Sequence, residues 1–268
     1  MPNLDHRFEG SIPEFYDRYM GPLFFQPYAA DLVASLSGFS NGQLLELAAG
    51  TGILSRGLAH SLPPAVTIVA TDLNQAMLDY AAARTDKRVS FRQADAQQLP
   101  FPDQSFDCVV SQFGVMFFPD KLAAYREVHR VLKPGAFFLF SAWDRIERNE
   151  LSFATVQALR EFFLGNPPSF LSRTPFGYFD TAQIQAQLRE ASFSTSQIKT
   201  VPLSCHASSP GDAALGLVQG SPLRNELAAM NPGLVDEVTA ALTASLTSRF
   251  GSGPFTTPMQ AHVCVARR

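Results

Sequence analysis

The sequence predicts an α/β protein with a doubly wound sheet. A buried-strand pattern, Leu44–Leu47, runs directly into the turn Gly50–Gly52, and a helix is expected to begin near Ile53. Further short apolar strands then alternate with segments of helical spacing, which is typical of βαβ units. The chain has 268 residues, of which 46% are hydrophobic. This is enough to bury the core of one large domain, or of a domain with an inserted cap.

Polar residues follow the predicted strands in order along the first half of the chain. Asp72 ends the strand that begins at Val66, Asp95 and Ala96 follow the strand Val89–Gln93, and Gln112 follows the strand Phe106–Ser111. The carboxyl ends of parallel strands lie at one edge of a sheet, where open α/β proteins bind ligands. An acid at the tip of the second strand can accept hydrogen bonds from both ribose hydroxyls.

The glycine turn indicates which nucleotide to expect. A dinucleotide fingerprint requires G-x-G-x-x-G, but the third glycine position holds Ser55 when counted from Gly50, and Ile53 when counted from Ala48. An NAD-dependent enzyme therefore requires a departure from its fingerprint. The sequence also has no G-x-x-x-x-G-K-[ST] phosphate loop. These observations favour a nucleoside without a pyrophosphate.

From about Leu44 to Asp144, five ordered motifs occur. They are the glycine loop, Thr71–Leu78, Gln93–Phe101, Phe106–Val110 and Arg130–Ala136. In these motifs the chain resembles the class I S-adenosylmethionine-dependent methyltransferases, in particular the group similar to the ubiquinone and menaquinone biosynthesis methyltransferases. The resemblance implies a Rossmann-like, mostly parallel, seven-stranded sheet, S-adenosyl-L-methionine as cofactor and S-adenosyl-L-homocysteine as product.

The resemblance also implies roles for individual residues. Asp72 would hold the ribose hydroxyls, Asp95 would accept from the adenine amino group beside the backbone of Ala96, and a tyrosine would close over the methionine part of the cofactor. Each has a simpler alternative, since an aspartate can cap a helix or serve a turn and the apolar residues can be core. The full set of predicted cofactor-binding residues is Tyr16, Glu46, Ala48, Gly50, Gly52, Asp72, Leu73, Met77, Asp95, Ala96 and Gln112.

One position departs from the family pattern. The loop of the family usually reads acid-x-G-x-G-x-G, and this chain has Glu46 as the acid but Ala48 at the first glycine. A methyl group is tolerable there where φ is negative, whereas a left-handed conformation would make it crowd the ligand. We retain cofactor binding as the prediction for this loop.

Beyond the cofactor motifs, the sequence predicts a substrate side. A helix is expected to stop at Lys133-Pro134-Gly135, before a strand over 136–142. Then follow a helix over 151–164, an aromatic loop over 170–179, a helix capped by Thr181, a strand near 197–203, a mostly helical stretch over 210–249 and a strand over 259–266. Because the last two strands pair in the family fold, the helical stretch is interpreted as an insertion between them.

These elements suggest one methyltransferase domain over residues 1–268. Its parts are an N-terminal helical cap (1–40), a cofactor-binding half (41–144) and a substrate-side half (145–268) with the helical insertion at about 210–250. The aromatic loop supplies the predicted acceptor-binding residues Phe176, Tyr178 and Phe179. Gln112 and His206 are the candidates for a direct role in catalysis, since Gln112 faces the expected meeting place of cofactor and acceptor and His206 adjoins the insertion.

Composition excludes several classes of protein. The formal net charge is −3 and no run of lysine and arginine occurs, which argues against a nucleic-acid partner. The longest apolar stretch is too short to span a bilayer, and Met1–Glu14 lacks the features of a signal peptide, so we expect a cytoplasmic protein. The three cysteines, Cys108, Cys205 and Cys264, indicate neither a disulfide framework nor a zinc site, and no metal is expected.

The function predicted from these features is transfer of a methyl group from S-adenosylmethionine to an O, N or C atom of a small, hydrophobic or aromatic molecule. The alternative is a protein that binds the cofactor or a partner on the same fold without catalysing methylation. The sequence leaves the acceptor, the methylated atom and the oligomeric state open.

Overall fold

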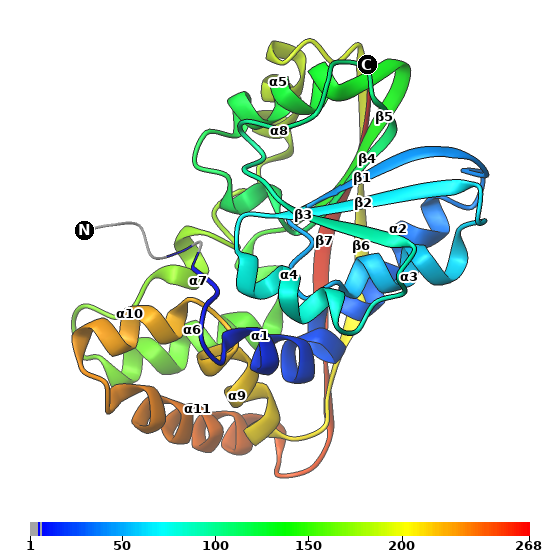
Figure 1. The fold of residues 1–268 in the computed structure, drawn as a ribbon. Helices are drawn as coiled ribbons and strands as arrows, with labels where there is room; N and C mark the ends of the chain where they lie inside the picture. The colour runs from blue at the N-terminus through cyan, green and yellow to red at the C-terminus, as the bar shows by residue number, and fades with distance from the viewer. Residues whose placement is uncertain (1–4, 6) are drawn as a thin grey trace.

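The computed structural model describes Asp5 and residues 7–268, so part of the segment Met1–Glu14 lies outside the described residues. At its centre is a seven-stranded sheet with the order β3-β2-β1-β4-β5-β7-β6 (Figure 1). The strands are β1 (Gly42–Leu47), β2 (Val66–Asp72), β3 (Val89–Gln93), β4 (Phe106–Gln112), β5 (Leu132–Trp143), β6 (Thr195–Ala207) and β7 (Phe255–Arg267). Strands β1 to β5 run parallel, and β7 is antiparallel to both β5 and β6. The doubly wound, mostly parallel sheet is therefore confirmed.

Helices cover both faces of the sheet. Helices α2 and α3 pack together on one side, and α5 and α8 pack together on the other (Figure 1). Their bounds are α1 (Ile12–Phe15), α2 (Gln26–Ser35), α3 (Ile53–Ser61), α4 (Gln75–Ala82), α5 (Lys121–Val131), α6 (Glu150–Phe162), α7 (Phe170–Arg173) and α8 (Thr181–Glu190). A π-helical segment, η1 (Tyr16–Phe25), joins α1 to α2, and single 3₁₀ turns form η2 (Val115–Phe117) and η3 (Ile146–Arg148).

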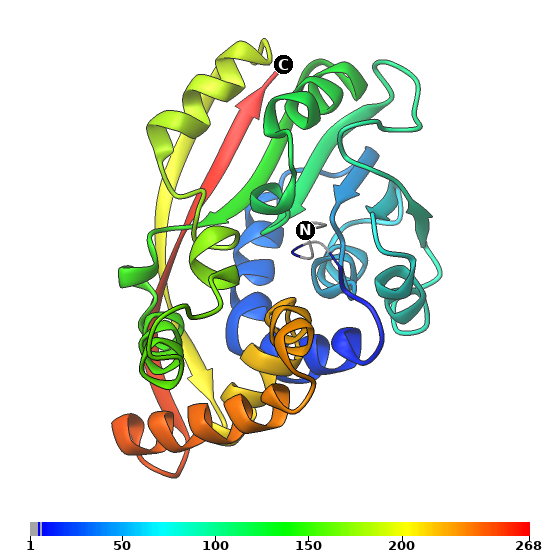
Figure 2. The same ribbon diagram turned by 90° about the vertical axis from the view of Figure 1, so that its left-hand side faces the viewer.

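The helical insertion lies between the last two strands, as predicted. It consists of α9 (Pro210–Gln219), α10 (Leu223–Met230) and α11 (Leu234–Phe250), which gather at one end of the molecule (Figures 1 and 2). The two strands that carry it are longer than predicted. Only residues 261–267 of β7 pair with β5, whereas residues 255–260 pair with β6 alone. This two-stranded extension reaches past the sheet, so its exposed residues do not show the burial pattern of a central strand.

Two local predictions were wrong. The segment Lys133-Pro134-Gly135 does not separate helix from strand, because β5 already begins at Leu132 and contains all three residues. Gly135 has a φ of +78°, and the register between β4 and β5 shifts beside it, so an irregular strand accommodates the proline. The cap of α8 is Asp180 rather than Thr181, since the Asp180 carboxylate accepts from the backbone N–H groups of Ala182 and Gln183.

No helix in the described part of the chain is long and apolar enough to cross a membrane.

Candidate functional site

The turn after β1 has the backbone conformation that its glycines allow. Gly50 and Gly52 have φ values of +56° and +79°. A Cβ on Gly52 would lie 3.0 Å from Ala81 and 3.0 Å from Thr85, so this glycine lets α4 approach the turn. A Cβ on Gly50 would meet nothing within 4 Å, and Gly50 lines a cavity. The two glycines therefore have different functions, one in helix packing and one at the cavity wall.

Ala48 adopts the left-handed conformation that the sequence analysis regarded as unfavourable for an alanine, with a φ of +52°. Its methyl group is accommodated beside Gly114, where a Cβ would lie 2.5 Å from the Cβ of Ala48. A left-handed alanine is strained by about 1–2 kcal/mol. The departure from the family pattern is thus compatible with the loop because residue 114 has no side chain.

Asp72 holds the turn from the tip of β2. Its Oδ2 accepts from the backbone N–H of Gly50 at 2.9 Å, and its Oδ1 accepts from the backbone and side-chain nitrogens of Asn74 at 2.8 and 3.2 Å. Burial raises the pKa of this carboxyl, because the hydrogen bonds from Asn74 and Gly50 only partly offset desolvation. The aspartate fixes both the glycine turn and the start of α4.

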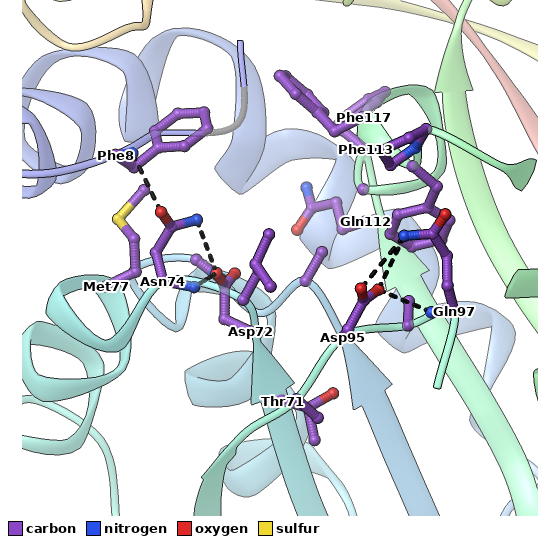
Figure 3. A pocket seen from close by; sticks show the side chains of 18 of the residues that line it. Phe8, Thr71, Asp72, Asn74, Met77, Asp95, Gln97, Gln112, Phe113 and Phe117 are labelled. Atoms are coloured by element: carbon purple, nitrogen blue, oxygen red, sulfur yellow. Dashed lines mark hydrogen bonds between the residues drawn. The ribbon is translucent and has the colours of Figure 1, made fainter. Parts of the chain in front are cut away.

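Asp95 lies across the cavity from Asp72, after β3 (Figure 3). The Asp95 carboxylate is exposed and accepts from the backbone N–H of Gln97 at 2.8 Å and from its side-chain amide at 3.1 and 3.2 Å. The Asx-type bond keeps the loop closed while leaving a carboxylate at the cavity edge.

The structure brings most of the predicted cofactor-binding residues to one cavity of about 240 Å³. Those that line it are Tyr16, Ala48, Gly50, Asp72, Leu73, Met77, Asp95, Ala96 and Gln112. Glu46 and Gly52 do not line it. Sequence reasoning missed other lining residues, among them Phe8, Asn74, Gln97 and Phe117. Asn74 and Gln97 stand within the quoted motifs and could have been found there, whereas Phe8 and Phe117 carry no local signal.

Glu46 lies instead in a second, small cavity beneath the turn. This cavity is also lined by Tyr16, Ala48, Thr51 and Gln112, so it adjoins the larger one. Burial raises the pKa of Glu46 to about 8, although its Oε2 accepts from the Ser55 hydroxyl at 2.6 Å. Within the described residues, the buried Thr51 hydroxyl has no hydrogen-bond partner. A carboxyl and a free hydroxyl are thus available to a polar ligand group here.

Tyr16 and Gln112 separate the cavities. The Tyr16 ring stacks on Phe25 with 4.7 Å between centroids, and burial together with the nearby Asp72 raises the pKa of its hydroxyl well above the usual range. The Gln112 amide donates to the backbone carbonyl of Phe25 at 2.6 Å. Both side chains are therefore oriented by the segment η1, which belongs to the predicted N-terminal helical cap.

An apolar pocket of about 60 Å³ adjoins the larger cavity. The two share four wall residues, Phe8, Tyr16, Phe113 and Phe117. The remaining lining residues come from separate parts of the chain, namely Met20, Phe24, Phe25, Trp143, Ser152, Phe170, Leu171, Pro175, Phe176, Leu217, Ser221 and Pro222. No Asp, Glu, Lys, Arg or His is among the described residues that line it. The pocket is suited to an uncharged, apolar molecule.

Only one of the three predicted acceptor residues lines this pocket. Phe176 does, with its ring 5.8 Å from that of Trp143. Tyr178 instead lies between α5 and α8, where its hydroxyl is 3.1 Å from that of Tyr125 and donates to Gln187. Phe179 lies away from the pocket against the Arg145 guanidinium, 5.4 Å from the ring centroid. Tyr178 and Phe179 therefore do not contribute to this pocket, because a chain turn sends neighbouring side chains in different directions.

His206 is also remote from both cavities. It lies on the exposed part of β6 within the hairpin extension, and its Nδ1 is 2.9 Å from the Thr256 hydroxyl. The longer strands explain this position, since they carry His206 away from the sheet edge. A cluster of three or more residues suited to metal binding was not found among the described residues.

Comparison with known proteins agrees with this geometry. Residues 45–140 match the family described as "Methyltransferase domain". The chain is 41% identical over 125 residues to the ubiquinone/menaquinone biosynthesis C-methyltransferase UbiE of Pseudomonas aeruginosa, and 37% identical over 124 residues to that of Cellvibrio japonicus. Residues 45–140 therefore form a methyltransferase domain, which is similar in sequence to the UbiE relatives. The matches cover 44% of this chain and 49–50% of those relatives, so the chain spans about half the length of the relatives it matches.

Solved structures show the same fold over a larger part of this chain. YcgJ of Bacillus subtilis superposes with a TM-score of 0.57 at 18% identity, covering 89% of this chain and 98% of that one. The [4+2]-cyclase SpnF superposes with a TM-score of 0.53 at 22% identity, covering 90% and 80%. At these identities the likeness describes the fold alone.

Proposed function

We propose that the protein transfers the methyl group of S-adenosylmethionine to an O, N or C atom of a small, hydrophobic or aromatic molecule. The observation that carries this proposal is the pair of adjoining cavities. One is edged by carboxylates and backbone groups at the strand tips, the other is lined by aromatic and aliphatic side chains, and the two share a wall. A transfer between two bound molecules requires this adjacency.

The residues of the first cavity fit the cofactor. The buried Asp72 at the tip of β2 is placed to accept from ribose hydroxyls, and the loop Asp95–Gln97 offers a carboxylate to the adenine amino group. Glu46 and the unpartnered hydroxyl of Thr51, in the small cavity beneath the turn, suit the ammonium and carboxylate of the methionine part. Polar groups therefore occur along the whole length that such a ligand would need.

The cofactor, when bound, supplies a methyl group on a sulfonium that is already an activated leaving group. The chain must mainly align the acceptor and exclude water, and alignment of this kind contributes roughly 7–11 kcal/mol to lowering a barrier. Because no charged side chain lines the apolar pocket within the described residues, we infer that the acceptor atom is nucleophilic before it binds, or loses its proton to solvent.

The UbiE relatives are named C-methyltransferases, which supports a carbon atom as the acceptor. Their similarity covers 44% of this chain, however, and several walls of the apolar pocket come from residues after 150. The pocket, rather than the relatives, therefore guides the choice of acceptor class in this proposal.

The proposal is tested in two steps. Isothermal titration with S-adenosylmethionine and S-adenosylhomocysteine should show binding, and Asp72→Ala should weaken it. Cell extract incubated with the protein and deuterium-methyl cofactor should then yield a labelled small molecule by mass spectrometry, with Asp72→Ala as the matched control. Binding without any labelled product would support the alternative, a non-catalytic cofactor-binding protein, and absence of binding would contradict both.

A further inference from the structure

The N-terminal strap, defined as Asp5 together with residues 7–11, crosses from one half of the site to the other. On the acceptor side, the carboxylate of the buried Asp5 pairs with the Arg173 guanidinium of α7 at 2.6 and 3.0 Å and also accepts from the Thr174 hydroxyl. The carbonyl of Arg7 accepts from the side-chain amide of Asn225 on α10 at 2.9 Å. The strap is thus bound to two helices of the substrate side.

On the cofactor side, the strap is bound to the start of α4. The backbone N–H of Phe8 donates to Oδ1 of Asn74 at 3.2 Å, and Asn74 in turn donates to Oδ1 of Asp72 through both of its nitrogens (Figure 3). A continuous series of hydrogen bonds therefore leads from the predicted ribose-binding carboxylate to the strap.

Phe8 occupies the position where the two cavities meet. Its half-buried ring lines both of them and makes edge-on contacts with Tyr16, at 6.0 Å between centroids, and with Phe117, at 5.8 Å. Phe117 belongs to η2, after β4, and Tyr16 begins η1. The ring therefore completes a wall built from three separate segments.

We propose that Phe8 is a positioning residue that closes the apolar pocket, and that the strap makes this closure depend on bound cofactor. Ligand bound at Asp72 orders Asn74, which holds the backbone of Phe8 and with it the ring. Because such coupling is reciprocal, a molecule in the apolar pocket should also favour the bound cofactor. The inference rests on the proposed function only in taking the first cavity as the cofactor site.

Trp143 is the single tryptophan of the chain and lines the apolar pocket. Quenching of its fluorescence by acrylamide therefore measures access of a small neutral molecule to this pocket. We expect Phe8→Ala to raise the quenching constant severalfold, Phe8→Leu to have an intermediate effect, and Phe162→Ala, on an exposed part of α6, to have none. An unchanged constant in Phe8→Ala that keeps its circular dichroism would overturn the proposal.

The coupling is measured by adding S-adenosylhomocysteine to the same samples. It should lower the quenching constant of the wild-type protein, and this decrease should be lost in Phe8→Ala. Asn225→Ala, which removes a strap contact outside both cavities, should raise the quenching constant and, because the coupling is reciprocal, weaken the binding of S-adenosylhomocysteine. If S-adenosylhomocysteine binds the wild-type protein without changing the quenching constant, the coupling is contradicted. If it does not bind, the proposed function is contradicted. In that case the quenching constants measured without ligand still decide the role of Phe8.

Discussion

The cofactor side and the acceptor side of the site are built in opposite ways. Most of the cofactor cavity comes from turns that directly follow β1 to β4, within residues 48–119, and short hydrogen bonds fix its acids and amides. The apolar pocket, where we propose that the acceptor binds, takes its walls from residues 8–222 and is held together by ring packing. Short sequence motifs specify the polar site, because its residues lie close together along the chain. The apolar pocket is specified only by the packing of the folded chain, because its residues lie far apart in the sequence.

The largest expected effect on ligand affinity comes from a substitution in the glycine turn, where an added side chain would occupy space that the ligand needs. Gly50→Val places a branched side chain in open space that the ligand needs and strains a positive φ, so the affinity for S-adenosylhomocysteine should fall by more than about a hundredfold. Titration calorimetry measures this affinity. Gly251→Val, which has the same open space and a φ of +85° but lies after α11, is the control and should bind normally. Normal binding by folded Gly50→Val would remove the turn from the cofactor site.

Removing the buried acid tests whether hydrogen bonding holds the cofactor side. Asp72→Ala deletes the acceptor for three protein N–H bonds and for the predicted ribose contact, which should weaken cofactor binding roughly ten- to a hundredfold. Asp95→Ala should have a smaller effect. The Asp95 carboxylate is exposed, so a ligand that binds to it must replace water, and the net gain in binding free energy is small. Asp79→Ala, on the surface of α4, serves as the control. Equal titration curves for all three variants would contradict the assignment of Asp72.

The close contact between Ala48 and Gly114 predicts that a side chain added at residue 114 lowers the free energy of unfolding. Gly114→Ala forces two methyl groups together and should destabilise the protein by about 1–3 kcal/mol in denaturant unfolding. The double variant Ala48→Gly/Gly114→Ala should regain most of this loss, because the remaining close atom is the Ser111 hydroxyl, which can rotate. If the two changes are additive, the two residues are not coupled and Ala48 is accommodated in another way.

Glu46 gives the cofactor side a pH dependence that the uncharged acceptor pocket lacks. Its pKa of about 8 keeps it neutral at low pH, so the affinity for a ligand ammonium should rise by up to about tenfold per pH unit as the pH increases from 6 to 8. Because the pKa is raised on folding, its contribution to stability is present at acidic pH and is lost as the pH rises toward 8. Calorimetry at several pH values should show this slope for the wild type but not for Glu46→Gln. A parallel slope in the variant would assign the effect to another group.

The smallest effect concerns the acceptor side, where many weak contacts share the binding. Phe176→Ala should raise the KM for the labelled acceptor roughly two- to tenfold and leave cofactor affinity unchanged, because it removes one ring from the pocket wall. Phe179→Ala, three residues further along and outside the pocket, is the matched control and should change neither. An effect of Phe179 equal to that of Phe176 would mean that the pocket extends beyond its present walls.

By itself, the sequence determined the strands of the first half, the glycine turn and the acids at the strand tips. These features follow from local patterns. A buried strand is recognised by its apolar residues and ends where a turn residue occurs, and the carboxyl ends of parallel strands lie at one edge of the sheet. It also indicated the helical insertion between the last two strands. It did not reveal the length of β6 and β7, because residues paired only with each other lack the burial pattern of a central strand.

The tertiary structure alone decided which aromatic residues form the apolar pocket. Phe176 and Tyr178 stand two positions apart in one aromatic stretch, yet one lines the pocket and the other is bonded between two helices. It also brought Phe8 to a wall shared with Phe113, and placed Ala48 against Gly114. Such contacts join residues far apart in the chain, and their geometry depends on the packing of whole helices and strands rather than on any local preference.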